Sequence, residues 1–289
     1  MDFAHRRVIV TCGEGFTKEI QEMARKQKGK AEETQEKPAI SESRVTESGE
    51  TVEGKKRVAE RIVSMHAAHL SGQEVVDGFL SRPAAGGERP AIVLVHGYRG
   101  LNDDQRAVTR RFAQEGFVCL SPDLFEGKTF RTPEECALRK TSLEIPRAVN
   151  KIIDSVPYLR QLPWVGNKKV AVLGFCMGGG LALFALAQSK AFDAGVIYYQ
   201  SLFPDPEDLQ GITAPLLCHY GTDDHITNTR EIAMFRDTLD KYKKKYEIEM
   251  YEGAGHSFLN NPPGKNAAIQ DAAAKSVIKT SEWLRRVLL

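Results

Sequence analysis

Residues 170–186 read VAVLGFCMGGGLALFAL. The apolar run at residues 170–173 predicts a short buried strand, and the run at residues 179–186 predicts a buried helix. Between them lies a G-x-C-x-G pentapeptide centred on Cys176. A nucleophile elbow has this arrangement, because the reactive residue sits on a strained turn and small neighbours leave room for its backbone. The stretch therefore predicts a strand, a tight turn and a helix, with Cys176 as the nucleophile.

This elbow carries cysteine at the position where serine is usual. A thiol at a helix N-terminus has its thiolate stabilised by the helix dipole and by free backbone N–H groups. A small core cysteine beside packing glycines is the alternative interpretation of Cys176. The residues that follow along the chain decide between the two.

Both partners that a nucleophilic cysteine needs follow it in the chain, in the order acid and then histidine. The strand-like residues 214–220 lead into Asp223 and Asp224. We choose Asp224 as the carboxylate that orients the histidine, and Asp223 is a competitor that is more typical of a turn. The strand-like residues 246–251 lead into His256, which has glycines nearby. We predict that His256 is the base that takes the thiol proton.

Acyl transfer also requires hydrogen-bond donors for the oxyanion. The first expected donor is the backbone N–H of Met177, directly after the nucleophile. The second is expected from the H-G-x-x-G loop that follows the apolar run Ala91–Val95. Within this loop we choose the backbone N–H of Tyr98, and an ordinary glycine-rich turn is the alternative.

These segments together resemble the dienelactone hydrolase family of α/β-hydrolases, over roughly residues 60–289. The resemblance implies an α/β-hydrolase fold, a triad of Cys176, Asp224 and His256, and cleavage of a small-molecule carboxylic ester or lactone without a cofactor or metal. The segments that carry it keep the family's order along the chain: SPDLF at 121–125, GFCMGG at 174–179, GTDDH at 221–225 and YEGAGHSF at 251–258.

Two positions depart from the family's pattern. The family has a glutamate that contacts the resting nucleophile where this chain has Gly97, and an arginine that binds the substrate carboxylate where it has Asn260. A second family arginine has no unambiguous match here among its candidates, which are Arg131, Arg139 and Arg147. The acyl-transfer groups are therefore preserved better than a pocket for dienelactone itself.

The missing glutamate has a consequence for the nucleophile. A carboxylate beside Cys176 would oppose formation of the thiolate by like-charge repulsion. With glycine in its place, we expect a standing thiolate–imidazolium pair with His256. Asp123, in the segment at 121–125 that resembles the family and follows the second core strand, is interpreted as a structural loop residue.

The composition excludes several classes of protein. The chain has 40 basic and 38 acidic residues and no basic patch with interleaved aromatic residues, so we expect no nucleic-acid partner. No run of about 18 apolar residues occurs, so no membrane span is expected. Five scattered cysteines suit a reducing compartment, and we expect a cytoplasmic enzyme, with an organellar address as the alternative. No compact Cys/His spacing indicates a metal site, and the chain is expected to be a monomer or homodimer.

The chain divides into two parts by composition. Residues 21–57 are charged and contain few large apolar groups, so they cannot bury enough surface to offset the entropy of ordering. We expect residues 1–57 to form a flexible charged extension, with a partner-binding segment as the alternative. Residues 58–289 are expected to form the α/β-hydrolase domain.

Alternating strands and helices in this domain predict a mostly parallel sheet with helices on both faces. An antiparallel hairpin is expected at residues 61–69 and 74–81. Further strands are expected at 91–95, 117–121, 170–173, 194–199, 215–220 and 246–251. Helices are expected at 103–115 with Asp103 as the N-cap, at 134–159 with an interruption at Pro146, and at 267–287. The triad then lies at the C-terminal ends of strands, where ligands bind in such sheets.

Two loops, at residues 126–133 and 201–206, are expected at the same edge of the sheet. Side chains at this edge are expected to contact the substrate, although each also suits ordinary loop packing: Arg99, Phe130, Arg131, Phe203 and Phe258. The alternative activity is that of a broad carboxylesterase or a phosphotriesterase-like hydrolase. An alternative of another class is a non-catalytic fold that recruits a partner through its N-terminal extension. A redox role for Cys176 is disfavoured, because no resolving cysteine is close in sequence.

Overall fold

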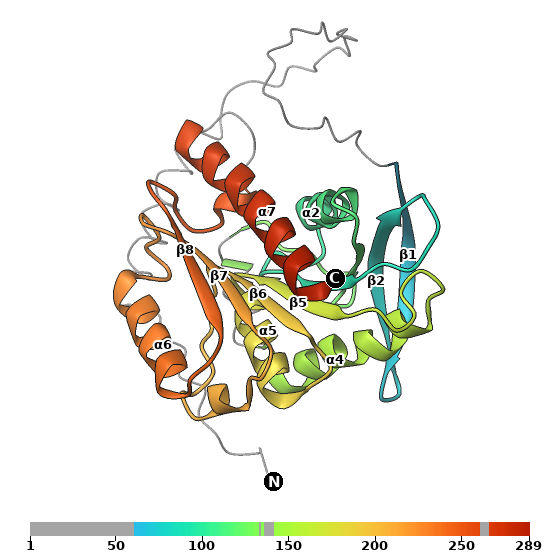
Figure 1. Ribbon diagram of the computed structural model, residues 1–289, viewed down its shortest axis with the longest axis horizontal. Coiled ribbons are helices and arrows are strands. Elements are labelled where there is room, and N and C mark those ends of the chain that lie inside the picture. Colours follow the sequence, from blue (N-terminus) through green and yellow to red (C-terminus); the bar gives the residue numbers. More distant parts are fainter. Residues whose placement is uncertain (1–60, 133, 136–141, 261–265) are drawn as a thin grey trace, which may run out of the picture. The chain divides into compact units, whose positions relative to one another are not determined.

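The computed structural model describes residues 61–132, 134–135, 142–260 and 266–289. The expected extension at residues 1–57 and Arg139 lie outside this range. The described residues form an eight-stranded sheet with helices on both faces (Figure 1), which confirms the predicted α/β class. The strands are β1 Ile62–Ser71, β2 Glu74–Pro83, β3 Ala91–Val95, β4 Val118–Pro122, β5 Val170–Phe175, β6 Ala194–Tyr198, β7 Leu216–Gly221 and β8 Tyr246–Tyr251.

The order of the strands across the sheet is β1-β2-β4-β3-β5-β6-β7-β8. The hairpin of β1 and β2 joins the sheet by antiparallel pairing of β2 with β4. All the remaining pairs, from β4 through β3 to β8, are parallel. The C-terminal ends of β3, β5, β6, β7 and β8 therefore meet at one edge of the sheet.

Alternation along the central strands divides the core into two layers. Ala91, Val93 and Val95 of β3 pack on one side with residues of the helices α4 (Ile145–Gln161), α5 (Met177–Gln188) and α6 (Thr229–Lys241). Ile92 and Leu94 pack on the other side with residues of α2 (Asp103–Gln114) and α7 (Ala267–Leu288). Because successive side chains of a strand point to opposite faces, a strand buried on both sides is apolar throughout, as β3 is.

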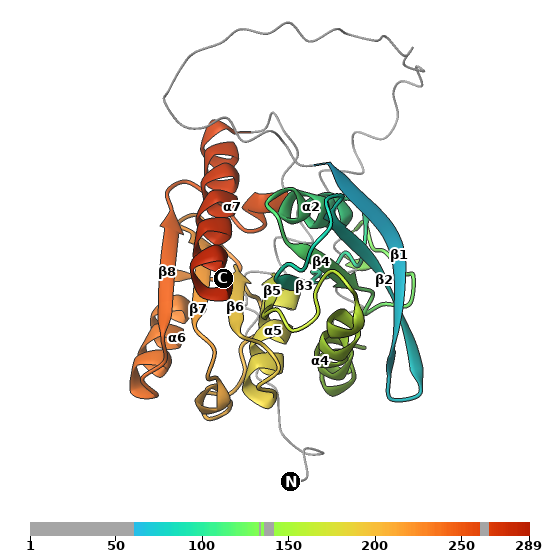
Figure 2. The same ribbon diagram turned by 45° about the vertical axis from the view of Figure 1, so that its right-hand side comes forward.

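Helices flank the sheet in the arrangement that this alternation requires (Figure 2). The helices α2 and α7 cover one face, and α4, α5 and α6 cover the other. The elements are α2 Asp103–Gln114, α4 Ile145–Gln161, α5 Met177–Gln188, α6 Thr229–Lys241, α7 Ala267–Leu288, and two short 3-10 turns, η1 Asp208–Gly211 and η2 Phe258–Asn260.

The structure corrects one detail of the predicted helices and shifts another. The N-cap of α2 is Asn102, whose side chain accepts a hydrogen bond from the Gln105 backbone N–H at 3.0 Å, so Asp103 is the first helical residue. The expected interruption lies just before Pro146: residues 142–144 are not helical, α4 begins at Ile145, and Pro146 lies in its first turn, where the missing N–H costs nothing. Pro157 lies inside α4 without ending it.

A buried polar network joins α7 to the centre of the sheet. The ring of His219 on β7 lies 2.9 Å from both the Tyr251 hydroxyl and the Thr280 hydroxyl of α7. The Tyr198 hydroxyl contacts Thr280 at 2.7 Å and donates to the Ser276 carbonyl at 3.1 Å. Burial lowers the pKa of His219 to about 3, so the ring is neutral in the folded protein.

Candidate functional site

Cys176 occupies a strained position between β5 and α5. Its φ is +55° and its ψ is −119°, which a non-glycine residue adopts only when the surrounding structure holds it there. Two glycines make the turn possible. A methyl group at Gly174 would overlap the carbonyl oxygen of Gly178, and one at Gly178 would overlap the carbonyls of Val95 and His96. The G-x-C-x-G pattern thus reflects close backbone packing around the elbow.

The loops after β7 and β8 bring an acid and an imidazole together. Nδ1 of His256 lies 2.9 Å from Oδ2 and 3.1 Å from Oδ1 of Asp224. Asp224 is 5% exposed, and its Oδ1 also accepts the backbone N–H groups of Ile226 and Thr227. Asp223 instead holds the turn, with its backbone N–H donating to the Ala254 carbonyl at 3.0 Å.

These contacts assign distinct functions to the two ring nitrogens of His256. Because Asp224 accepts from Nδ1, the proton resides there and Nε2 is left as the basic nitrogen. Nε2 is buried and makes no hydrogen bond of regular geometry with another described side chain. The Cys176 thiol is close enough for its charge to interact with the ring.

The charges of the thiol and the imidazole favour each other. Burial is the largest single influence on the Cys176 thiol and raises its pKa, but the charge and hydrogen bonding of His256 act together with neighbouring donors to lower the pKa overall. The Ser201 hydroxyl and the Met177 backbone N–H contribute to this lowering. Burial likewise disfavours a charged His256, but the thiolate and the Asp224 carboxylate raise its pKa above the usual value. The balance favours an ion pair.

The H-G-x-x-G loop after β3 lies against the elbow. A methyl group added at Gly97 would lie 3.5 Å from the Cβ of Cys176, so the position that differs from the family's glutamate is adjacent to the thiol-bearing residue. The fully buried His96 fixes this loop, since its Nδ1 lies 2.8 Å from the Gly97 carbonyl and its Nε2 accepts from the Leu124 N–H at 3.1 Å. Tyr98, two residues further on, is half-buried.

The loop after β4 is held by the residue that we interpreted as structural. The Asp123 carboxylate accepts the backbone N–H groups of Phe125 at 2.8 Å and Gly127 at 2.6 Å. Further along this loop, Phe130 packs edge-on against Phe125, with 5.7 Å between ring centroids. Asp123 therefore shapes the loop and is not placed in the triad.

Three of the expected substrate contacts gather in one hollow. The exposed residues Arg99 and Arg131 and the half-buried Phe130 line a space of about 310 Å³ beside the start of α2. The other two expected contacts do not line this space. Phe203 is half-buried and packs against Phe235 of α6, with 6.0 Å between ring centroids. Phe258 has no exposed surface and packs in the core against Tyr199, which corrects the expectation that it contacts substrate.

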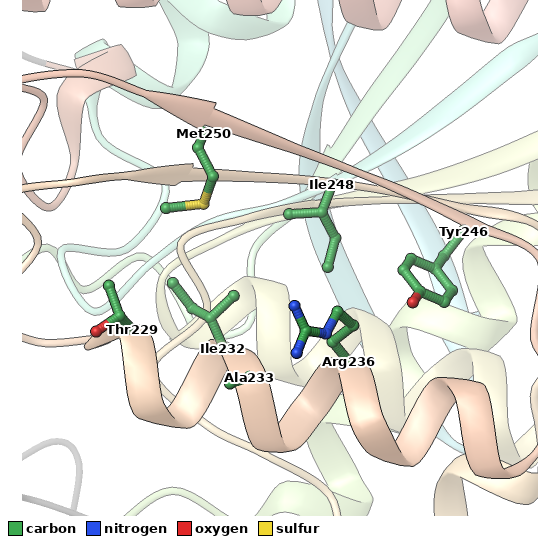
Figure 3. A pocket seen from close by; sticks show the side chains of 7 residues that line it. All are labelled: Thr229, Ile232, Ala233, Arg236, Tyr246, Ile248 and Met250. Carbon is green, nitrogen blue, oxygen red and sulfur yellow. The ribbon is translucent and has the colours of Figure 1, made fainter.

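A second hollow lies away from the predicted site residues. Figure 3 shows Ile232 and Arg236 of α6 facing Ile248 and Met250 of β8. The space that these residues line has a volume of about 480 Å³. None of the triad residues lines it. In the described part of the chain, no cluster of His, Cys, Asp and Glu side chains is arranged to hold a metal ion. No described helix is both long and apolar enough to cross a bilayer.

Sequence reasoning missed two residues of this site. Ser201, in the loop that follows β6, places its Oγ 3.4 Å from Sγ of Cys176. Tyr199 has a φ of +35° and packs its ring edge-on against His256, with 5.1 Å between centroids. The sequence indicated only their position: Ser201 begins the loop at 201–206 that was expected at the active-site edge, and Tyr199 ends the expected strand 194–199 that leads to this loop.

A parallel sheet with an elbow after β5, an acid after β7 and a histidine after β8 defines an α/β-hydrolase. The profile of the dienelactone hydrolase family matches residues 76–288. The chain belongs to this family, and it is an ester or lactone hydrolase.

Individual relatives agree with the family profile. Protein usf of Aquifex pyrophilus is 31% identical over 192 residues, covering 64% of this chain and 82% of that protein. A carboxymethylenebutenolidase of Rhodococcus opacus is 29% identical over 214 residues, covering 70% and 83%. The crystal structure of a dienelactone hydrolase-like promiscuous phosphotriesterase from metagenomic libraries has the same fold, with a TM-score of 0.70 and 21% identity over 79% of this chain and 99% of that chain.

Proposed function

We propose that this hydrolase cleaves carboxylic esters or lactones by nucleophilic catalysis at Cys176, through a thioester acyl-enzyme. The observation that carries the proposal is the pairing of an elbow cysteine at φ +55° with a histidine that the buried Asp224 orients. Such a nucleophile, base and orienting acid is the general arrangement for covalent acyl transfer.

In the proposed acylation step, the thiol proton resides on Nε2 of His256 and the thiolate attacks the carbonyl carbon. A C–S bond forms while the carbonyl π electrons move to oxygen, and the backbone N–H groups of Met177 and Tyr98 stabilise that oxyanion. The oxyanion then collapses, the C–O bond of the ester breaks, and His256 returns its proton to the leaving alkoxide.

The second half of the cycle releases the acid. His256 takes a proton from water, and the resulting hydroxide attacks the thioester carbonyl of Cys176. A second oxyanion forms and collapses with loss of the thiolate, which recovers its ion pair with the imidazolium. Asp224 stays ionised throughout and stabilises the charged ring at each step.

The proposed substrate is an ester or lactone other than the family's dienelactone. Gly97 supplies no carboxylate beside the nucleophile, and Asn260 supplies no cation at the position of the family's arginine. We therefore propose a broad ester specificity, with Arg99 and Arg131 available for an anionic group at the rim. The fold neighbour named as a promiscuous phosphotriesterase makes phosphotriesters the second class to assay.

A substrate panel with one matched variant tests this proposal. Nitrophenyl esters of increasing acyl length, enol-lactones and phosphotriesters are assayed with the wild type and with Cys176→Ala. We expect hydrolysis of at least one ester or lactone and its loss in the variant by a factor of about 10³ or more, since the covalent route is removed. Equal hydrolysis by the two proteins would refute the proposed nucleophile.

A further inference from the structure

Ser201 is held beside the nucleophile by backbone hydrogen bonds. Its N–H donates to the Cys176 carbonyl at 3.1 Å, which fixes the two residues relative to each other. The preceding residue, Gln200, is held through its carbonyl, which accepts the Thr227 hydroxyl at 2.7 Å. The following residue, Leu202, packs directly against Gly180 in the first turns of α5, where a methyl group would overlap it. The backbone that carries the Ser201 side chain is therefore held in place on both sides.

The Ser201 hydroxyl reaches the reacting atom itself. Its Oγ lies 3.4 Å from Sγ of Cys176, a hydrogen-bond length for the large sulfur atom. The titratable groups around Sγ are His256 from the loop after β8, with Asp224 behind it from the loop after β7, and Tyr199 from the end of β6. The loop after β3 places the uncharged Gly97 beside Cys176.

Thus two kinds of group can stabilise a charge on the sulfur. His256 supplies a positive charge, and the Ser201 hydroxyl and the Met177 backbone N–H supply donors with no charge of their own. A hydroxyl can act either as donor or as acceptor, and it donates when its neighbour is an anion. Beside a thiolate, the Ser201 hydroxyl is therefore the donor and the sulfur is the acceptor.

We propose that Ser201 donates a hydrogen bond to the Cys176 thiolate in the resting enzyme and thereby sets the pH at which the nucleophile becomes active. The inference rests on the proposed function, because it concerns the same sulfur. Ser201 is a positioning and charge-stabilising residue in this account: the thiol proton still goes to Nε2 of His256, and no bond to Ser201 forms or breaks.

The proposed hydrogen bond from Ser201 has two opposing effects on the reactivity of the sulfur, and these effects can be measured. A donor that stabilises the thiolate increases the thiolate fraction at low pH, but it also lowers the intrinsic nucleophilicity of the sulfur. When Sγ attacks a carbonyl, its negative charge moves to the oxyanion and the Ser201 hydrogen bond weakens. Removing the hydroxyl should therefore move the midpoint of thiol reactivity to higher pH without lowering the plateau reached at high pH.

The experiment compares four full-length proteins: wild type, Ser201→Ala, Ser201→Thr, and Ser281→Ala as the matched control. Ser281 is a buried serine of α7 whose hydroxyl makes no hydrogen bond with a described group, so its loss tests a serine-to-alanine change alone. The rate of iodoacetamide labelling at Cys176 is measured against pH by mass spectrometry of its peptide. Ester hydrolysis is measured in parallel.

We expect the labelling midpoint of Ser201→Ala to rise by about one pH unit, the size of effect expected for a hydrogen bond to a charged group. Ser201→Thr should return the midpoint close to that of the wild type, and Ser281→Ala should not move it. The plateau rate of Ser201→Ala should equal or exceed that of the wild type, and the acid limb of kcat/KM should follow the labelling midpoint.

Three results would overturn the inference. They are an unchanged midpoint in Ser201→Ala, an equal shift in Ser281→Ala, and a threonine variant with the midpoint of the alanine variant. Labelling reads the thiol without turnover, so these outcomes are independent of whether Cys176 is the nucleophile. Failure of the proposed function would appear instead as undiminished hydrolysis by Cys176→Ala.

Discussion

The chemistry of this site depends on how two side chains share one proton. Cys176 and His256 are both half-buried, and their partial removal from water would by itself favour the neutral form of each. In the ion pair that we propose, the charge on each group stabilises the charge on the other, and Asp224 behind the ring favours the imidazolium. A glutamate at position 97 would add a like charge to the thiolate, so its replacement by glycine favours the ion pair.

The first prediction concerns the thiol. Because its pKa is lowered chiefly by the charge of His256, the labelling midpoint of Cys176 should lie below about 8.5, the usual value for a free thiol. In His256→Gln the positive charge is absent, and burial should raise the midpoint above that value. Iodoacetamide labelling against pH measures both, and a wild-type midpoint at or above that of the variant would contradict the prediction.

The second prediction concerns the acid. Asp224→Asn keeps the shape of the side chain but can donate to Nδ1, which places the imidazole proton on the wrong nitrogen. We expect kcat for the best ester to fall by about 10²–10⁴, with little change in KM. The control is Asp223→Asn, which alters the neighbouring turn residue. Comparable losses in the two variants would show that the loop, and not the orientation of His256, matters.

At the scale of elements, the elbow joins β5 to α5 at the expense of backbone strain. The φ of +55° and ψ of −119° at Cys176 are unfavourable for any residue with a Cβ. Glycine tolerates this conformation, but it has no thiol. The strained turn therefore lowers the stability of the fold, and in return it presents the side chain of Cys176, the proposed nucleophile.

This strain predicts the relative stabilities of two inactive variants. Cys176→Gly should be more stable than Cys176→Ala by about 1 kcal/mol, because only alanine keeps the strained Cβ. At Ser189, where φ is −135°, the same two replacements should not favour glycine. Denaturant unfolding of the four variants measures this difference. A glycine variant less stable than the alanine variant at position 176 would mean that the elbow is not strained.

The elements themselves were largely predictable from sequence, and their details were not. The apolar run of β3 and the alternating run of β8 give strands with the expected bounds, because a strand covered on both faces is apolar throughout and an edge strand alternates. The N-cap of α2 was misassigned and the interruption was placed at Pro146 instead of just before it, since neighbouring polar residues compete for a cap and a proline fits either a break or a first turn. Which residue caps a helix, and where a proline lies relative to its first turn, depend on the backbone geometry.

The candidate site was predictable to a similar extent. The order of Cys176, Asp224 and His256 follows from the topology, in which successive parallel strands end at one edge. Ser201 was not identified, because its contact with Sγ depends on the backbone of two different strands meeting at the elbow. A lone serine in a loop has no sequence pattern that distinguishes it from any other.

For the whole molecule, the network around His219 links the packing of α7 to pH. The folded-state pKa is lowered to about 3, whereas the unfolded chain titrates near 6.5. Below pH 6.5 the unfolded chain binds a proton that the folded protein does not, so this residue makes stability fall as pH decreases from 6.5 towards 3. Above pH 6.5 its contribution is complete.

This argument predicts a pH-dependent difference between two proteins. Between pH 7.5 and pH 5.0, the free energy of unfolding of the wild type should fall by about 2 kcal/mol more than that of His219→Gln, which has no proton to bind at this position. Denaturant titrations at the two pH values measure the difference. Parallel pH profiles would show that His219 does not couple folding to protonation.

The central claim is that Cys176 carries the acyl group during turnover. The most direct measurement mixes the enzyme with an excess of a nitrophenyl ester, quenches the reaction in acid within the first turnover, and determines by mass spectrometry which peptide is acylated. This account predicts one acyl group on the peptide that contains Cys176, formed at least as fast as steady-state turnover and removed by later hydrolysis. Rapid hydrolysis with no acyl group on Cys176 at any time would contradict it.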